Sequence, residues 1–361
     1  MKILIIGNGF DLAHGLPTKY TDFLERTRKF FAYRNGVSPD SELGKSFSDA
    51  LLRNGLYDEF CEVEDNVWLE HFINRYERNL LKDNTWIDFE NEVKYVVEKF
   101  EKMLSSRLNS VLHDANSWDF FPKKFRDSSP EALKSLNSAT RIPAFSNFML
   151  SHLKQFTRAF EIYCLCVINE KTRNNSMRVL TSHDFDAVLS FNYTNTFETL
   201  YGNDKIKFCY IHGKAQPAAE KTNMIFGIDE TLSDGKESTF FTFARFKKYF
   251  QRILYKTGSE YKDWIRDIGR TGEKCEIYIL GHSLGSTDHE VLKEFFKFLN
   301  YAKITIFYHD PISEIQAIEK VIEMIGKDNL TQRVHGSNWT IRFANQYDKN
   351  IGIMRHLKKE A

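Results

Sequence analysis

Short uninterrupted runs of apolar residues recur along this chain of 361 residues, and a turn signal follows each run. The first run, residues 2–6 (KILII), shows no alternation of apolar and polar positions, which is typical of a strand buried on both faces of a parallel sheet. Runs of the same kind predict four further strands, at residues 186–191, 207–211, 276–280 and 303–308. Together these runs predict one parallel sheet.

The segment between the last two predicted strands carries apolar residues at helical spacing, from residue 288 to residue 299. A strand, a helix and a second strand in this order form a right-handed crossover between parallel strands. Because the N-terminal run is of the same kind, we expect it to join the same sheet. The predicted fold class is α/β.

Residues 21–175 follow a different pattern, in which apolar residues recur every three or four positions and no strand pattern is present. The pattern predicts helices at 20–31, 65–81, 85–104 and 145–168. It predicts loop broken by short helix at 34–56 and loop with local structure at 114–146. The expected domain organisation is a first strand and Gly-rich loop at 1–20, a large helical insertion or cap at 21–175, and the remainder of the α/β domain at 176–361.

Composition narrows the class of protein. Lys and Arg total 50 against 49 Asp and Glu, so no basic excess indicates a nucleic-acid partner, and a nuclease is disfavoured. The five Cys follow no disulfide or zinc pattern, which suits reduced thiols. No apolar stretch approaches the roughly 20 residues that span a bilayer, and no signal-peptide cleavage site is present. We expect a cytoplasmic protein with no membrane partner and no metal.

Polar or glycine residues follow every predicted strand. They are Gly7-Asn8-Gly9, Asn192, His212-Gly213, Gly281-His282-Ser283 and His309-Asp310. In an open α/β sheet the ligand crevice lies outside the carboxyl ends of the strands. A glycine-rich turn there can present backbone N–H groups to a phosphate, although many such turns bind no ligand. The five sets together predict a convergent site.

The sequence GHSLG around Ser283 matches the nucleophile elbow of α/β-hydrolases. In that alternative Ser283 is the nucleophile, with Asp310 and His335 following in the required order. The long helical region before the motif counts against it, because hydrolases carry most of their sheet before the elbow. A Gly-rich turn that binds a nucleotide accounts equally well for the GHSLG motif.

Over nearly its whole length the sequence resembles the AbiH family of bacterial phage abortive-infection proteins. The motifs that carry this likeness are IIGNGFDLAHGLPTKYTDFL, WIDFE, SFNYTNTFE, IHGK and ILGHSLGSTD. A more distant similarity is to the sirtuin (SIR2-like) NAD-binding fold. Its motifs match, in the same order, Gly7–Asp11 with Gly15–Pro17, Asn192–Thr194, His212-Gly213 and Gly281–Ser283.

The departures from the sirtuin pattern limit what it implies. Asp11 stands where sirtuins have Ser, Thr194 stands where they have Asp, and their zinc-binding Cys module is missing, so protein deacetylation is not expected. The resemblance implies a SIR2-like Rossmann-type sheet and an anti-phage protein that binds NAD, as substrate or ligand, and hydrolyses its nicotinamide–ribose bond. It leaves open a phage-derived trigger or partner protein and a homo-oligomer.

The resemblance also implies roles for individual residues. His212 would bind ribose hydroxyls or act as general base towards water, and Asn192 would fix the ribose or the attacking water. The alternative for His212 is a core histidine bonded to backbone. The expected cofactor-binding residues are Gly7, Asn8, Gly9 and Phe10 for the diphosphate, Asp11 for the nicotinamide amide or a ribose, Gly281 and Ser283 for the adenosine side, and Asp288 for a ribose or merely a helix cap.

Two questions stay open from the sequence. Trp86, Asp88 and Glu90 of the WIDFE motif have no sirtuin counterpart, so they either begin a helix or supply a carboxylate to the crevice. The pocket, in turn, either turns NAD over or serves a non-catalytic nucleotide-sensing protein.

Overall fold

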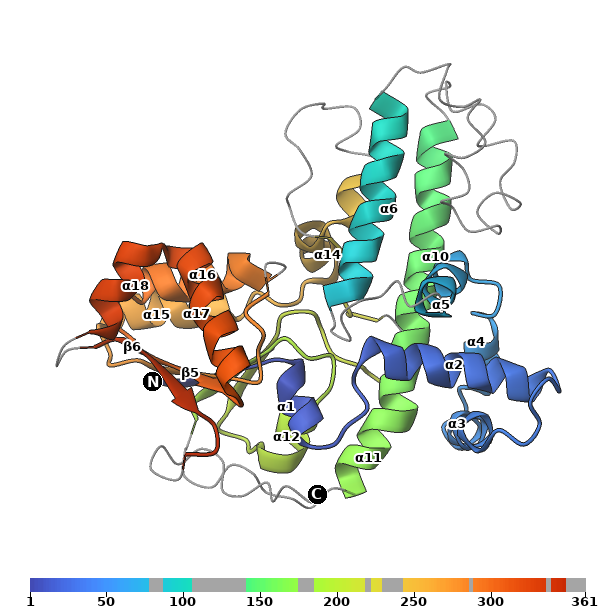
Figure 1. The fold of residues 1–361 in the computed structure, drawn as a ribbon, viewed down its shortest axis with the longest axis horizontal. Coiled ribbons are helices and arrows are strands. Elements are labelled where there is room, and N and C mark those ends of the chain that lie inside the picture. Colours follow the sequence, from blue (N-terminus) through green and yellow to red (C-terminus); the bar gives the residue numbers. More distant parts are fainter. Residues whose placement is uncertain are drawn as a thin grey trace. The chain divides into compact units, whose positions relative to one another are not determined.

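The computed structural model describes residues 1–77, 87–105, 141–174, 185–217, 222–228, 243–285, 288–335 and 339–348 (Figure 1). The chain divides into a sheet unit (Met1–Thr18, Ile168–Ala215 and Lys256–Ala361) and a helical unit (Lys19–Val167 and Gln216–Tyr255). The sequence analysis placed everything after residue 175 with the sheet, whereas Gln216–Tyr255 groups with the helical unit.

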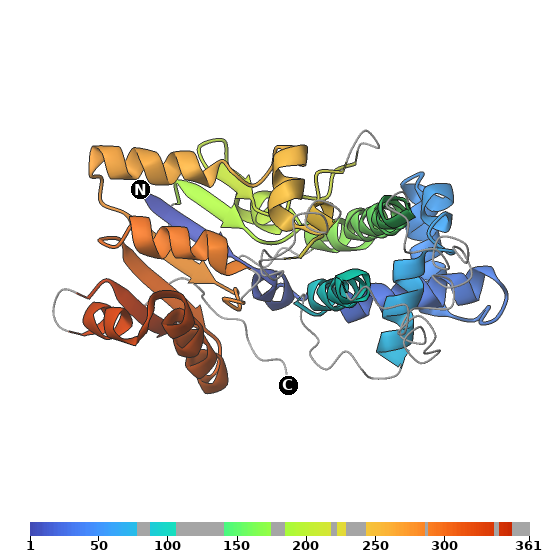
Figure 2. The same cartoon turned by 90° about the horizontal axis from the view of Figure 1, so that it is seen from above.

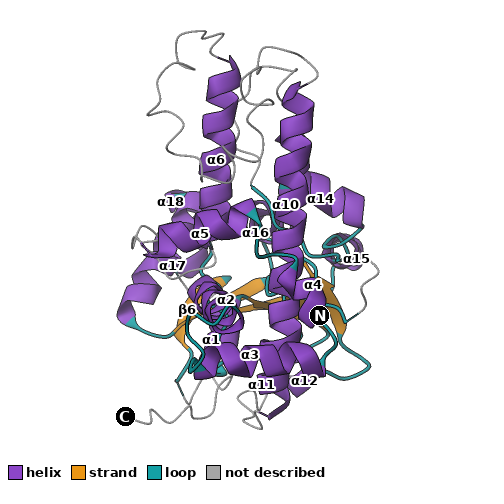
Figure 3. Cartoon of the chain, turned by 90° about the vertical axis from the view of Figure 1, so that its right-hand side faces the viewer, coloured by secondary structure: helices purple, strands orange, loops and turns teal. Residues whose placement is uncertain are grey.

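Six parallel strands form the sheet, in the order β3-β2-β1-β4-β5-β6 (Figure 3, orange). Their bounds are β1 Lys2–Ile6, β2 Ala187–Ser190, β3 Lys207–Tyr210, β4 Glu276–Leu280, β5 Lys303–Tyr308 and β6 Ile341–Asn345. The five predicted strands and the α/β class are confirmed. The sequence analysis missed β6, an edge strand whose charged Arg342 interrupts the apolar run.

Strand β1 lies at the centre of the sheet and pairs with β2 on one side and β4 on the other. Its alternate side chains enter two different apolar clusters, Ile3 and Ile5 on one face and Leu4 and Ile6 on the other. All four are at most 2% exposed, so the unbroken run KILII is buried on both faces as predicted.

Helices cover both faces of this sheet. Residues of α15, α16, α17 and α18 share the cluster of Ile3, and residues of α1 and α12 share the cluster of Leu4. Figure 2 shows the first four in orange and red beside the strands. The helices of the sheet unit are α1 Asn8–Ala13, α11 Asn169–Asn174, α12 Thr196–Tyr201, α15 Tyr261–Thr271, α16 His289–Phe298, α17 Pro311–Ile325 and α18 Lys327–Val334. The helix predicted at 288–299 is α16.

The helical unit is built around stacked and edge-on aromatic rings, among them Phe23, Phe89 and Phe156. Its helices are α2 Tyr20–Arg34, α3 Glu42–Arg53, α4 Tyr57–Cys61, α5 Val67–Glu77, α6 Ile87–Ser105, α10 Arg141–Tyr163, which continues as a π-helix to Ile168, the 3₁₀ turn Ala244–Phe246, and α14 Lys248–Tyr255.

Most helix predictions for this unit are confirmed over the described residues, as α2, α5, α6 and α10. At 34–56, where loop broken by short helix was expected, α3 is that helix, and its twelve residues make it longer than expected. Residues 114–140 of the second expected loop lie outside the described residues, and 141–146 belong to α10.

Two loops meet at the centre of the sheet through their backbones. The N–H of Gly9, after β1, donates to the carbonyl of Gly281, after β4, at 2.8 Å. Gly281 has φ +64°, and a Cβ there would collide with the backbone nitrogen of Phe10. A Cβ on Gly9 would lie 2.8 Å from the Gly281 carbonyl oxygen. Glycine is therefore required here by close packing of the two loops.

We expect Gly281→Ala to destabilise the protein by about 3 kcal/mol or more, because the methyl group adds a collision to the cost of a positive φ. Gly272→Ala is the matched control, since Gly272 also has a positive φ (+65°) but nothing lies within 4 Å of its Cβ position. It should cost only about 1 kcal/mol. Urea unfolding followed by circular dichroism measures both, and equal losses would contradict the packing argument.

Candidate functional site

The strand order places a topological switch point between β1 and β4. From β1 the chain winds outward through β2 and β3, and from β4 it winds the other way through β5 and β6. Because all strands are parallel, the residues that follow β1, β2, β3 and β4 emerge at one edge of the sheet. Open α/β sheets bind their ligands at this position.

The Gly-rich loop after β1 uses most of its amides internally. The N–H of Gly7 makes a long bond of 3.4 Å to the carbonyl of Leu280, Gly9 bonds Gly281, and Phe10 donates to Gly7 at 2.9 Å. Three of the four amides expected to hold a diphosphate are thus already bonded within the chain. The loop therefore packs against the loop after β4. Of the four amides, only that of Asn8 makes none of these bonds.

Asn192 connects the end of β2 to this loop. Its Nδ2 donates to the carbonyl of Gly7 at 3.0 Å, and its own N–H donates to the hydroxyl of Ser190 at 3.1 Å. The side chain is 3% exposed. The structure therefore brings together Asn192 and the Gly-rich loop, as the sequence predicted, with the amide oxygen of Asn192 still an acceptor.

Asp11, on α1, is completely buried. Its Oδ2 accepts a hydrogen bond from the hydroxyl of Thr194 at 2.5 Å, and Thr196 in turn donates to Thr194 at 3.2 Å. Burial raises the pKa of Asp11 to about 6, and the side chains of Thr194, Thr196 and Asn192 counteract part of that shift. A carboxyl group that titrates near neutrality thus lies at the switch point.

Asp288 joins two imidazoles. Its Oδ1 lies 3.1 Å from Nε2 of His212, after β3, and its Oδ2 lies 3.5 Å from Nε2 of His282, after β4. The N–H of Leu284 donates to Nδ1 of His282 at 2.9 Å, so the neutral His282 ring carries its hydrogen on Nε2, towards Asp288. The Phe191 ring packs edge-on against both imidazoles.

Asp288 precedes α16, but its side chain makes no capping hydrogen bond to that helix. Asp288 thus holds the N-cap position of the helix, as one alternative from the sequence expected, while its carboxylate orients His212. His282 is a residue that the expected site omitted. The sequence feature that could have identified His282 is its position directly after Gly281, at the end of a predicted strand. The serine-hydrolase motif instead favoured the next residue, Ser283, as the functional one.

The structure does not assemble a serine-hydrolase triad. Ser283 is exposed, no histidine of the described residues hydrogen bonds it, and the positive φ values of the motif fall on Gly281 (+64°) and Leu284 (+54°), not on Ser283. Asp310 accepts from the N–H of Ser313 at 2.7 Å and so caps α17, and His335 is exposed. The hydrolase alternative gains no support, and contact of Ser283 with adenosine stays a prediction.

The structure describes the WIDFE motif only in part. Trp86 and the side chain of Asp88 lie outside the described residues. Glu90 is buried and pairs with Nζ of Lys248 at 2.8 Å, which ties α6 to α14 inside the helical unit. This ion pair gives Glu90 a structural partner within its own unit.

A family model described as bacteriophage abortive infection AbiH matches residues 3–310 of the chain. The chain belongs to the AbiH family. The likeness seen in the motifs is therefore confirmed, and the family assigns this AbiH protein a role in abortive infection by phage. No curated protein and no solved structure matches the chain.

Among the described residues, no three His, Cys, Asp or Glu side chains are placed to hold a metal ion. No helix in the same part of the AbiH chain is both long and apolar enough to cross a membrane.

We expect Asp11→Asn to stabilise the protein at pH 8 by at most about 3 kcal/mol, because burial raises the pKa of Asp11 to about 6 and the ionised form is disfavoured in the folded state. The folded-state pKa is raised, so ionisation disfavours folding. The penalty is absent below about pH 4, grows as pH rises to 6, and is complete above it. The stabilisation should therefore shrink as pH falls from 8 to 4.5.

Urea unfolding across this pH range measures the effect. Asp204→Asn, at an exposed turn position of the same unit, is the control and should change nothing. A stabilisation by Asp11→Asn that is independent of pH would show that Asp11 is not ionised at a raised pKa.

Proposed function

We propose that this AbiH protein binds NAD at the carboxyl edge of its sheet and hydrolyses the nicotinamide–ribose bond. The observation that carries the proposal is the meeting of an imidazole–carboxylate pair, His212 with Asp288, and a buried carboxyl group, Asp11, at the switch point. Fold alone does not imply this activity, so the argument rests on these side chains.

The chemistry requires orientation and electrostatics. As the bond to nicotinamide breaks, positive oxocarbenium charge develops on the ribose, and a carboxylate held in a low-dielectric site stabilises it. Asp11 is such a group, and perturbed pKa values of this kind cluster at functional sites. Asn192 supplies an amide oxygen beside it to fix the ribose or a water molecule.

His212 would serve as the general base. Donation from its Nε2–H to Asp288 leaves the lone pair on Nδ1, the nitrogen that accepts a proton from the attacking water. The same carboxylate stabilises the imidazolium that then forms. Asp288 therefore acts by positioning His212 and setting its tautomer.

The proposal includes an opening step. Asp11, Asn192 and His212 are each at most 5% exposed, so in this form the site is closed to a dinucleotide. Loops at the sheet edge must move before NAD enters. An alternative, a nucleotide sensor without turnover, uses the same pocket and differs only in the absence of chemistry.

The test is nicotinamide release by the purified protein, and NAD content of phage-infected cells that express it. We expect His212→Ala and Asn192→Ala to lower release at least 100-fold, because each removes a group that acts on water or ribose. His309→Ala is the matched control, an exposed histidine at the end of β5 outside the cluster, and should leave release unchanged.

Circular dichroism must show that the variants are folded. Release that survives both substitutions would overturn the residue assignment. NAD binding in a direct titration, without release in either setting, would favour the sensor. The absence of both binding and release would overturn the proposal as a whole.

A further inference from the structure

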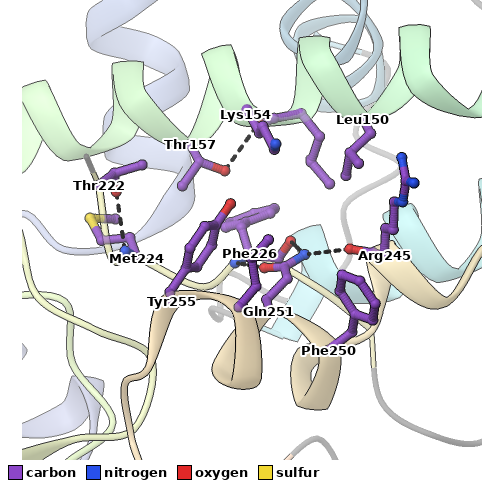
Figure 4. Close-up of a pocket in the computed structure, with 12 residues that line it drawn as sticks. Leu150, Lys154, Thr157, Thr222, Met224, Phe226, Arg245, Phe250, Gln251 and Tyr255 are labelled. Atoms are coloured by element: carbon purple, nitrogen blue, oxygen red, sulfur yellow. Dashed lines mark hydrogen bonds between the residues drawn. The ribbon is translucent and has the colours of Figure 1, made fainter. Parts of the chain in front are cut away.

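The helical unit contains a cavity of about 260 Å³ that the proposed function does not use (Figure 4). Figure 4 shows α10 along one side of this cavity and α14 on the opposite side. From α10 come Leu150, Leu153 and Thr157, spaced three and four residues apart so that they share one helix face. The segment 222–226 forms a further wall.

The buried polar groups of the wall are satisfied within the protein. Gln251, on α14, accepts the N–H of Phe226 at 2.9 Å and donates to the carbonyls of Phe226 and Arg245 at 3.0 and 3.2 Å. The hydroxyl of Thr157 donates to the carbonyl of Leu153 at 2.8 Å. The interior therefore offers mainly apolar and aromatic surface to a ligand.

Two cations lie at the edge of this cavity. Lys154 and Arg245 both line it and are both exposed, and neither pairs with a carboxylate among the described residues. One nitrogen of Arg245, Nη1, donates to the side chain of Asn147 at 2.8 Å, which holds the guanidinium in place. An apolar cavity with positive charge at its edge is complementary to an apolar molecule that carries one acidic group.

Tyr255 adds a hydrogen-bond donor. Its hydroxyl points from α14 towards α10 (Figure 4), and burial raises its pKa, so it stays protonated at neutral pH. With the rings of Phe226 and Phe250 it also gives the cavity aromatic walls, which favour a flat aromatic ligand.

We propose that this cavity binds a small aromatic carboxylic acid, with its ring between α10 and α14 and its carboxylate at Lys154 and Arg245. The volume lies below the roughly 300–1,000 Å³ of sites for drug-sized molecules, so the ligand is smaller than these. The site belongs wholly to the helical unit, and its occupancy is independent of the NAD proposal.

The experiment compares 3-phenylpropionate with the uncharged 3-phenylpropanol, by calorimetry or ligand-observed NMR on the full chain. We expect the acid to bind with a Kd of about 1 mM or tighter. The double variant Lys154→Gln/Arg245→Gln should weaken binding of the acid about tenfold and leave the alcohol unchanged. Lys45→Gln, an exposed cation on α3, is the matched control and should change neither.

A second variant tests the location. Leu150→Trp places a bulky ring in the cavity from a half-buried position, so it should abolish binding of both probes while the circular dichroism spectrum is retained. Binding that survives this substitution would place the probe elsewhere and overturn the proposal. Equal affinity for acid and alcohol, or no binding of the acid at millimolar concentrations, would also overturn it.

Discussion

The backbone contact between the loops after β1 and β4 is the constraint on which the candidate site depends. The Gly9 N–H bonds the Gly281 carbonyl at 2.8 Å, in a space where neither residue can carry a side chain. Because this contact fixes the start of α1 and the loop after β4, it also sets the positions of Asp11 and His282. Packing alone thus accounts for these glycines, and any case for a nucleotide must come from the side chains around them.

Those side chains are costly to bury. A carboxyl group removed from water is tolerated only with partners, and even with the Thr194 hydroxyl Asp11 ionises at a raised pKa of about 6. Asp288, whose side chain is 15% exposed, pairs with two imidazoles at once. An apolar residue in place of Asp11 would avoid the cost of burial, and groups with perturbed pKa values of this kind cluster at functional sites.

The sequence predicted the elements that local pattern decides and missed those that tertiary contacts decide. Strands β1, β2, β4 and β5 were visible because they are buried on both faces, which leaves a continuous apolar run. The edge strand β3 was also found, although Cys209 is the only buried residue within it. The twelve-residue α3 was expected only as a short helix within loop, because Ser, Gly and Asp break up its apolar face. The grouping of Gln216–Tyr255 with the helical unit depends on long-range bonds such as Lys248 to Glu90, which no local pattern reveals.

The candidate site shows the same division. Polar residues after five strands predicted convergence, yet only those after the four strands β1 to β4 take part. His309 and Asp310 follow β5, one strand beyond the switch point, and Asp310 caps α17. Asp288 shows the reverse: it stands before a helix like a cap, and its carboxylate points to His212 and His282 because β3 and β4 bring both to it. Strand order, which the sequence does not state, therefore decides which strand-end residues form the site.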